Sequence, residues 1–402
     1  MTPEAIVHTD NVFRRPISPT ERLYFSTREL NPPFLMQLAI TGTGPIRAAE
    51  LQRAVNIASA ADPGSRLVRD GEYWIDSGAP AVVRIVPGGT LNYPALENDP
   101  ILNSPIGPTP DRTCEVLLLT GDPVTIVFRV FHGAMDGMGV RMWVMDVFRA
   151  LRGEQPLGAT DPTTDADLVA RLGAPGRSTL VLPVFPSPAG CGRQDPAASP
   201  WLLRNRSIAV TGKGTVARVA AILATAAGAK SRFLIPVDMR RHAPGLRSTA
   251  NLALPLFLDV EPGEDWRAIN AEKRIGLQEN RELNQLDNGG LSHCPPFVVR
   301  AVLRMANWVG SRLNRNIVSA TLSHTGRFEL DELSGPGFTA TAARVLPQHT
   351  GIMPMLFGIV EYGGTTDITV SCRNGEGVEA RLEALLDYIA TTLERDLSNA
   401  TL

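Results

Sequence analysis

The pattern of apolar and polar positions is clearest between residues 124 and 150. Val124–Phe131 is a run of mostly apolar, β-branched residues, which is typical of a buried strand. After a short segment with two glycines, apolar residues recur at helical spacing, at Val140, Trp143, Val144, Val147 and Phe148. The pattern therefore predicts a strand, a tight loop and a helix in succession.

The same interpretation extends along the chain and alternates strands with helices. Short apolar runs predict strands at residues 34–40, 73–75, 81–86, 114–119, 232–237, 252–260, 317–323, 354–362 and 367–372. Apolar residues three or four positions apart predict helices at residues 48–60, 212–230, 266–285, 296–313 and 376–397. Ser18 and Glu21 form a capping-box pattern at the start of another helix. Together these elements predict an α/β (α+β) fold.

The composition changes after the predicted central helix. Proline, glycine, alanine, serine and threonine dominate residues 153–205, including the stretch GEQPLGATDPTTDAD. Such a composition is typical of a long connection with little regular structure. We therefore expect an N-terminal lobe at residues 1–152, a crossover linker at residues 153–205 and a C-terminal lobe at residues 206–402.

Composition and charge limit the classes of function. The 402-residue chain is 44% hydrophobic and 20% charged, which predicts a globular protein with two cores. Its net charge of −2 and its dispersed arginines argue against a nucleic-acid partner. No apolar stretch is long enough to span a membrane, and the N-terminus lacks a signal-peptide pattern. We therefore expect a cytoplasmic protein without integral membrane association.

Cysteines and histidines give no pattern of a metal site. Cys114, Cys191, Cys294 and Cys372 are far apart, and the six histidines show no ligand spacing. We expect reduced thiols and no bound metal. The sequence also contains neither a P-loop nor a GxGxxG turn after a strand, so we expect no tightly bound nucleotide cofactor.

One histidine and one aspartate stand at the predicted strand-loop-helix junction. His132 follows the strand, and Asp136 precedes Gly137 at the helix start. An imidazole has a pKa of about 6.5, so it can accept and return a proton near neutral pH. Asp136 can orient that ring or hold the loop by pairing with an arginine. A structural histidine beside an aspartate helix cap is the alternative that these residues leave open.

The sequence His-x-x-x-Asp-Gly at a strand end resembles the signature of the chloramphenicol acetyltransferase-like superfamily, which includes condensation domains and stand-alone acyltransferases. The resemblance implies two lobes, each a mixed sheet with flanking helices, that form a V around a central tunnel. It implies acyl transfer to a hydroxyl or an amine. His132 would be the general base, and Asp136 and Gly137 would complete the catalytic motif.

The resemblance also implies the substrates. The acyl donor would be a phosphopantetheine thioester, carried by coenzyme A or by an acyl or peptidyl carrier protein that arrives in trans. The acceptor would be a small molecule of secondary or lipid metabolism. The protein itself would be a monomer or a weak dimer.

Further stretches resemble the same superfamily. Residues 18–23 resemble its opening motif. Residues 235–256 resemble a segment in which an arginine pairs with the motif aspartate. That resemblance implies that Arg240 supports Asp136, with Arg241 as the alternative. It also implies a polar loop near the catalytic histidine, and the candidates for tunnel or oxyanion contacts are Ser323, Gly326 and Asn251.

The sequence departs from the condensation-domain pattern at one position. Phe131 stands where those domains usually carry a first histidine, which places the chain nearest to the stand-alone condensation-type acyltransferases. Two alternatives stay open. The scaffold can support cyclisation, dehydration or epimerisation of a carrier-bound intermediate, or the chain can be an inactive member that binds a carrier protein.

Overall fold

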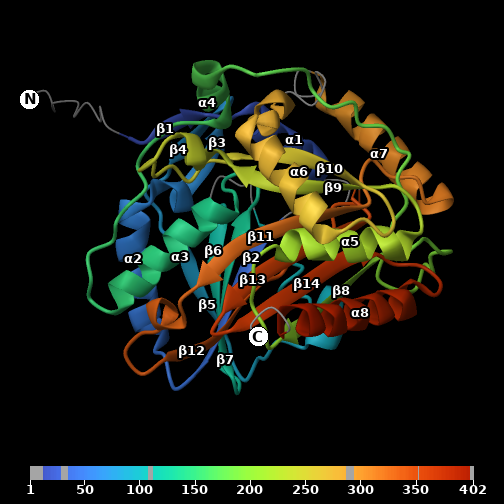
Figure 1. Cartoon of the computed structure of the whole chain (residues 1–402). Coiled ribbons are helices and arrows are strands. Elements are labelled where there is room, and N and C mark those ends of the chain that lie inside the picture. Colours follow the sequence, from blue (N-terminus) through green and yellow to red (C-terminus); the bar gives the residue numbers. More distant parts are fainter. Residues whose placement is uncertain (1–11, 29–34, 107–111, 287–293, 352, 399–402) are drawn as a thin grey trace, which may run out of the picture.

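Two large mixed sheets with helices on their faces make up the protein (Figure 1). The computed structural model describes residues 12–28, 35–106, 112–286, 294–351 and 353–398. The prediction of an α/β fold with two mixed sheets is confirmed.

The N-terminal sheet has five strands in the order β12-β2-β7-β6-β5, and only β5 and β6 are parallel neighbours. The strands are β2 (Leu35–Thr43), β5 (Val82–Val86), β6 (Cys114–Leu119), β7 (Val124–Phe131) and β12 (Thr339–Val345). Two helices bury their apolar faces against this sheet, α2 (Ala48–Ala61) and α3 (Gly137–Leu151).

A small sheet lies beside the N-terminal lobe, in the order β1-β4-β3. Its strands are β1 (Arg14–Pro16), β3 (Leu67–Asp70) and β4 (Tyr73–Asp76), and α1 (Pro19–Arg28) follows β1. The predicted capping box at the start of α1 is confirmed. The Ser18 amide donates to Glu21 Oε2 at 3.0 Å, and the Glu21 amide donates to Ser18 Oγ at 3.4 Å.

The C-terminal sheet has six strands in the order β10-β9-β11-β13-β14-β8. They are β8 (Trp201–Ile208), β9 (Ser231–Asp238), β10 (Ala253–Val260), β11 (Ala320–Phe328), β13 (Met355–Tyr362) and β14 (Thr365–Arg373). Strand β11 runs parallel to both of its neighbours, and the other pairs are antiparallel. The helices of this half are α5 (Thr215–Ala227), α6 (Trp266–Gln278), α7 (Pro296–Leu313) and α8 (Val378–Ser398).

The helices form where the apolar spacing predicts them, because one face of each is buried. On α3, Val140, Trp143, Val144, Val147 and Phe148 are all in the core. The helix predicted at residues 266–285 ends earlier than expected. Asn280 takes a left-handed backbone conformation with φ of 53°, which stops α6 and leaves a separate short 3-10 turn.

The halves of the sequence do not coincide with the two sheets. Strand β12, from the range expected for the C-terminal lobe, pairs with β2 over seven residues and so completes the N-terminal sheet. The expected linker contains α4 (Asp165–Leu172), and its last residues begin β8. A buried ion pair between Glu97 and Arg204, at 3.0 Å, also joins the two halves. The lobes are therefore interlocked.

Candidate functional site

His132 lies where β7 ends, at the junction of the two lobes. Its neighbours Phe131, Ala134, Met135 and Asp136 are buried, whereas His132 keeps part of its surface exposed. Its ring stacks on Tyr24 of α1, with the ring centroids 4.2 Å apart. The ring is therefore held by packing against α1.

The orientation of the His132 ring follows from Asn251, which precedes β10 in the other lobe. His132 Nδ1 and Asn251 Oδ1 are 3.2 Å apart. Asn251 Nδ2 donates to Glu21 Oε1 at 3.3 Å, and a carboxylate can only accept such a bond. The amide oxygen therefore faces His132 and accepts from Nδ1. This contact and the hydrogen bonds to the backbone of His132 and Met135 orient the ring.

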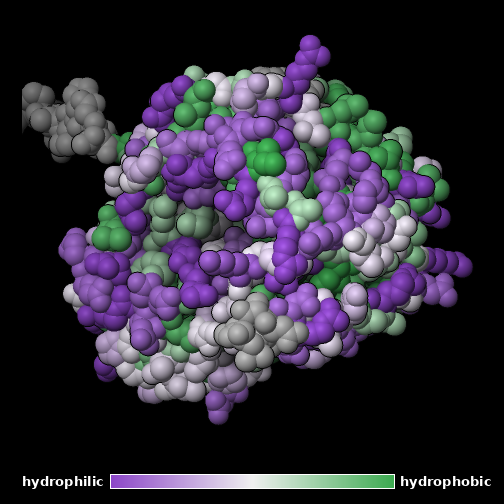
Figure 2. All heavy atoms as spheres, viewed as in Figure 1, coloured by the Kyte–Doolittle hydropathy of each residue, from purple (hydrophilic) through white to green (hydrophobic). Residues whose placement is uncertain are grey.

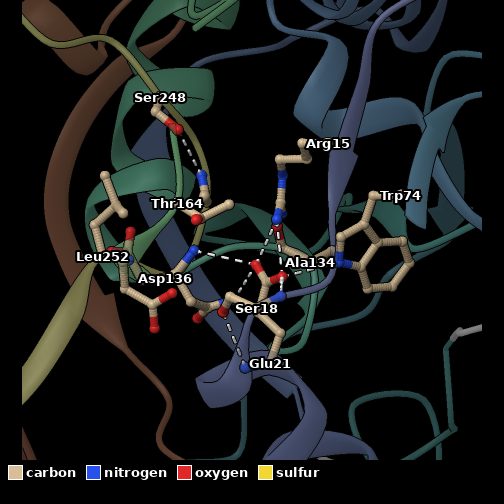
Figure 3. Close-up of polar contacts among 12 residues, drawn as sticks. Arg15, Ser18, Glu21, Trp74, Ala134, Asp136, Thr164, Ser248 and Leu252 are labelled. Atoms are coloured by element: carbon tan, nitrogen blue, oxygen red, sulfur yellow. Dashed lines mark hydrogen bonds and ion pairs between the residues drawn. The ribbon is translucent and has the colours of Figure 1, made fainter. Parts of the chain in front are cut away.

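Glu21 is the buried centre of this arrangement (Figure 3). Its carboxylate accepts hydrogen bonds from Arg15, the Ser18 amide and the Trp74 indole, at 2.8, 3.0 and 3.2 Å. Arg15 also donates to the carbonyl of Ala134, at 2.8 Å, within the loop after His132. Because Glu21 is fully buried and held from several sides, it fixes Asn251, and Asn251 fixes the ring.

Burial controls the proton affinities here. Desolvation lowers the pKa of His132, although the nearby Asp136 charge opposes that shift. The neutral ring, which is the form that accepts a proton, therefore predominates at neutral pH. Burial and the same carboxylate raise the pKa of Tyr24, so its hydroxyl stays protonated beside the histidine.

Asp136 supports the loop and the helix. Its Oδ1 accepts from the Gly139 amide at 2.7 Å, which caps α3, and its Oδ2 accepts from the Leu252 amide at 2.8 Å. Arg240 donates to both carboxylate oxygens, at 3.0 and 3.2 Å. Arg241 turns away and contacts Glu282 at 3.1 Å. Of the two arginines considered, Arg240 is thus the one that pairs with Asp136.

The Asp136–Arg240 pair is buried and fully hydrogen-bonded. Arg240 also donates to the carbonyls of Ser248 and Ala250 at 2.7 and 3.0 Å. Burial opposes the charge of the guanidinium, yet the carboxylates of Asp136 and Asp238 outweigh it and raise the Arg240 pKa. The pair is therefore charged and joins the start of α3 to the loop before β10.

Several solved structures share this architecture over nearly their whole length. The first condensation domain of the calcium-dependent antibiotic synthetase, solved with a substrate analogue, matches with a TM-score of 0.64 and 16% identity over 96% of this chain and 97% of that chain. Polyketide synthase associated protein 5 from Mycobacterium tuberculosis matches with a TM-score of 0.61 and 15% identity over 95% and 97%. The chain has the condensation-domain fold.

A third similar structure contains bound ligands. A mutant starter condensation domain of rhizomide synthetase, in complex with C8-CoA and Leu-SNAC, matches with a TM-score of 0.59 and 16% identity over 94% of each chain. No family model and no curated protein sequence matches this chain. At such low identities the likeness is one of fold.

Within the condensation-domain fold, two motif glycines have different surroundings. A Cβ on Gly139 would lie 2.5 Å from the carbonyl oxygen of Thr249, so this position requires glycine. A Cβ on Gly137 would meet only Met36 and Thr325, at 3.4 and 3.8 Å, which are ordinary contacts. Gly137 instead borders a narrow, largely apolar pocket between the lobes, lined also by Met36, Leu38, Val140, Thr325, Phe328 and Val345.

The polar loop predicted near the histidine is part of β11. This strand continues past residue 323, with a register shift between His324 and Arg327. The Gly326 amide donates to His324 Nδ1 at 3.2 Å, and His324 Nε2 lies 3.4 Å from Glu361. Ser323 is partly exposed and pairs with Gly358. An oxyanion contact by Ser323 or Gly326 stays a prediction, whereas Asn251 is engaged with His132 and Glu21.

Tyr24, Arg15 and the role of Glu21 were not predicted from sequence. Only the capping box drew attention to Glu21, since its contacts with Asn251 and Trp74 join residues far apart in the chain. Within the described residues, no group of three or more His, Cys, Asp or Glu is placed to hold a metal ion. None of the described helices combines the length and the apolar composition that a membrane span requires.

Proposed function

We propose that this protein is an acyltransferase that moves an acyl group from a phosphopantetheine thioester to a hydroxyl or amine of a small molecule. The condensation-domain fold supports the reaction class. The observation that carries the proposal is the position of His132 at a strand end, with its ring oriented by Asn251 of the other half and stacked on Tyr24.

The reaction follows from that geometry. His132 Nε2 takes the proton of the acceptor as its oxygen or nitrogen attacks the thioester carbonyl carbon. A bond forms between the acceptor and the acyl carbon, the carbon–sulfur bond breaks, and the released thiolate takes the proton from the imidazolium. Asp136 and Arg240 hold the loop and do not touch the substrate.

The test is acyl transfer by the full chain with C8-CoA and a panel of amines and alcohols, followed by intact-mass analysis of the acceptors. His132→Ala should lower transfer by at least about 100-fold, the usual size of a general-base effect. Asn56→Ala is the control, because Asn56 is exposed on α2 and lies outside the proposed machinery. Unchanged turnover by the His132 variant would exclude the base role.

The same assay separates the alternatives. A carrier-binding protein without activity would give no acylated acceptor with any thioester. Cyclisation, dehydration or epimerisation would change the donor without adding acyl mass to a separate acceptor.

A further inference from the structure

A groove outside the His132 site is lined by arginines. Its volume is about 950 Å³, within the range of ligand sites. Four arginines line it, together with Trp308 and several polar residues, and among the described lining residues none is acidic; the arginines are Arg193, Arg304, Arg312 and Arg373. In a chain with net charge −2, this is a local concentration of positive charge.

The charge of this groove lacks the compensation found elsewhere in the protein. The buried arginines contact a carboxylate, as Arg15 contacts Glu21 and Arg240 contacts Asp136. The partly buried Arg373 donates instead to neutral oxygens, of Asn307 and Gly351 at 3.0 Å and of Asn316 at 3.5 Å. Burial without a nearby carboxylate lowers the pKa of Arg373. An anion bound in the groove would supply the negative charge that Arg373 lacks among its neighbours.

Trp308 supplies a flat surface at the same place. Its side chain is 56% exposed on α7, one helical turn from Arg304 and Arg312. An indole beside guanidinium groups can stack on an aromatic base while the arginines bind phosphate oxygens. The combination fits a nucleotide better than a simple phosphate ester.

The groove is linked to His132 by one short segment. The Gly351 carbonyl accepts from Arg373, and Gln348, three residues earlier, accepts from the Leu35 amide at 3.2 Å. Leu35 pairs with Phe131, the residue before His132. Residues 348 and 351 are at most about 11 Å apart, since an extended chain spans about 3.6 Å per residue.

We propose that this groove binds the phosphorylated nucleotide end of a coenzyme A thioester, with the arginines on its phosphates and Trp308 against the adenine. The inference rests on the proposed function and selects coenzyme A over a carrier protein as the donor. A carrier protein presents a single phosphodiester and no base, so it would leave most of this groove unused.

The test measures binding to the full chain by calorimetry with coenzyme A, dephospho-coenzyme A and pantetheine. We expect affinity to fall in that order, because each loses phosphate contacts. The double variant Arg304→Gln, Arg312→Gln should weaken coenzyme A binding at least about tenfold, since charge-assisted hydrogen bonds are strong. Trp308→Ala should weaken coenzyme A but leave inorganic pyrophosphate binding unchanged. The double variant Arg267→Gln, Arg274→Gln, which removes two positive charges from exposed positions of α6, is the control.

Equal affinity for coenzyme A and pantetheine, or no effect of the double variant, would overturn the proposal. So would inorganic pyrophosphate binding as tight as that of coenzyme A.

Figure 2 shows exposed hydrophobic residues over α7, at the upper right, with Phe297 and Met305 among the exposed residues of this helix. Co-sedimentation with phosphatidylglycerol vesicles is therefore a separate arm. Vesicle binding that needs Arg304 and Arg312, without coenzyme A binding, would assign the groove to lipid headgroups instead.

The proposed function can fail independently of this groove. An acyl-N-acetylcysteamine thioester carries no phosphate, so its turnover by the wild-type protein tests acyl transfer alone. His132→Ala should bind coenzyme A as the wild type does while losing transfer. Coenzyme A binding without transfer would support the groove and contradict the function. Transfer without coenzyme A binding would do the reverse.

Discussion

At the residue scale, the site depends on a chain of oriented side chains. Glu21 orients the amide of Asn251, and the amide oxygen of Asn251 contacts His132 Nδ1. Glu21 and His132 come from the N-terminal half and Asn251 from the C-terminal half. The His132 ring is therefore oriented only when both halves are assembled.

The pH dependence of activity should report the His132 environment. Burial lowers the His132 pKa, and the proton-free ring is the active form, so kcat/KM should rise with pH through a pKa below about 6.5 and then level off. Asn251→Ala removes the oxygen that accepts from Nδ1, and this hydrogen bond raises the His132 pKa in the wild type. The acidic limb should then move to lower pH.

Profiles of kcat/KM between pH 5 and 9 check this expectation, with thermal denaturation to confirm that the variant folds. Asn56→Ala makes the same substitution on the exposed face of α2 and should leave the limb in place. An Asn251→Ala profile that coincides with the wild type would mean that His132 does not set the rate.

Two adjacent arginines give a matched test of the buried ion pair. Arg240→Ala leaves the Asp136 carboxylate buried without its cation, so the free energy of unfolding should fall by about 3–5 kcal/mol. Arg241→Ala should cost about 1 kcal/mol or less, because that side chain is partly exposed and Glu282 keeps His242 as a partner at 2.9 Å. Urea denaturation of both variants measures the difference, and equal losses would contradict it.

At the element scale, the start of α3 is the point where the motif meets the other lobe. Asp136 caps the helix, and Gly139 lies against the backbone of Thr249. Helix, loop and ion pair are therefore one packed unit, in which the histidine occupies the position between strand and helix.

Alanine substitutions at the two glycines should separate close packing from helix preference. Gly139→Ala places a methyl group 2.5 Å from the Thr249 oxygen, so it should cost about 1–3 kcal/mol of stability. Gly137→Ala has room for its methyl group and should cost less than about 1 kcal/mol. Thermal unfolding compares the stability of the two variants. A larger loss of stability for Gly137→Ala would contradict the expectation that the Gly139–Thr249 contact excludes a side chain.

At the scale of the whole molecule, each lobe depends on residues from the other half of the sequence. Strand β12 leaves the C-terminal half to pair with β2, and Glu97 and Arg204 form a buried pair across the halves. The N-terminal sheet then lacks an edge strand unless the C-terminal half is present. The two lobes should consequently unfold together.

Separately expressed residues 1–200 should fail to fold, because β2 lacks its partner strand and Asp136 lacks Arg240. Circular dichroism and tryptophan fluorescence of the full chain should give coincident urea transitions. A fragment of residues 1–200 with its own cooperative transition would contradict the interlocked description. Mixing it with residues 201–402 is the control, since complementation should restore the fold.

The helices, the strands and the His-x-x-x-Asp-Gly motif could be predicted from the order of residues alone. The spacing of apolar residues on α3 and the run that forms β7 depend on short-range periodicity, which the order of residues carries directly. The position of His132 at a strand end follows from the same pattern. The resemblance also predicted Arg240 as the partner of Asp136, with Arg241 as the alternative that the sequence alone left open.

The contacts between residues far apart in the sequence are known only from the folded chain. The bond between Asn251 and His132, the role of Glu21, the pairing of β12 with β2 and the arginine groove all join segments far apart in the chain. Such contacts form because burial and hydrogen bonding are satisfied across the whole fold, and no local periodicity specifies a partner. The base is thus visible in the sequence, while its orientation belongs to the folded chain.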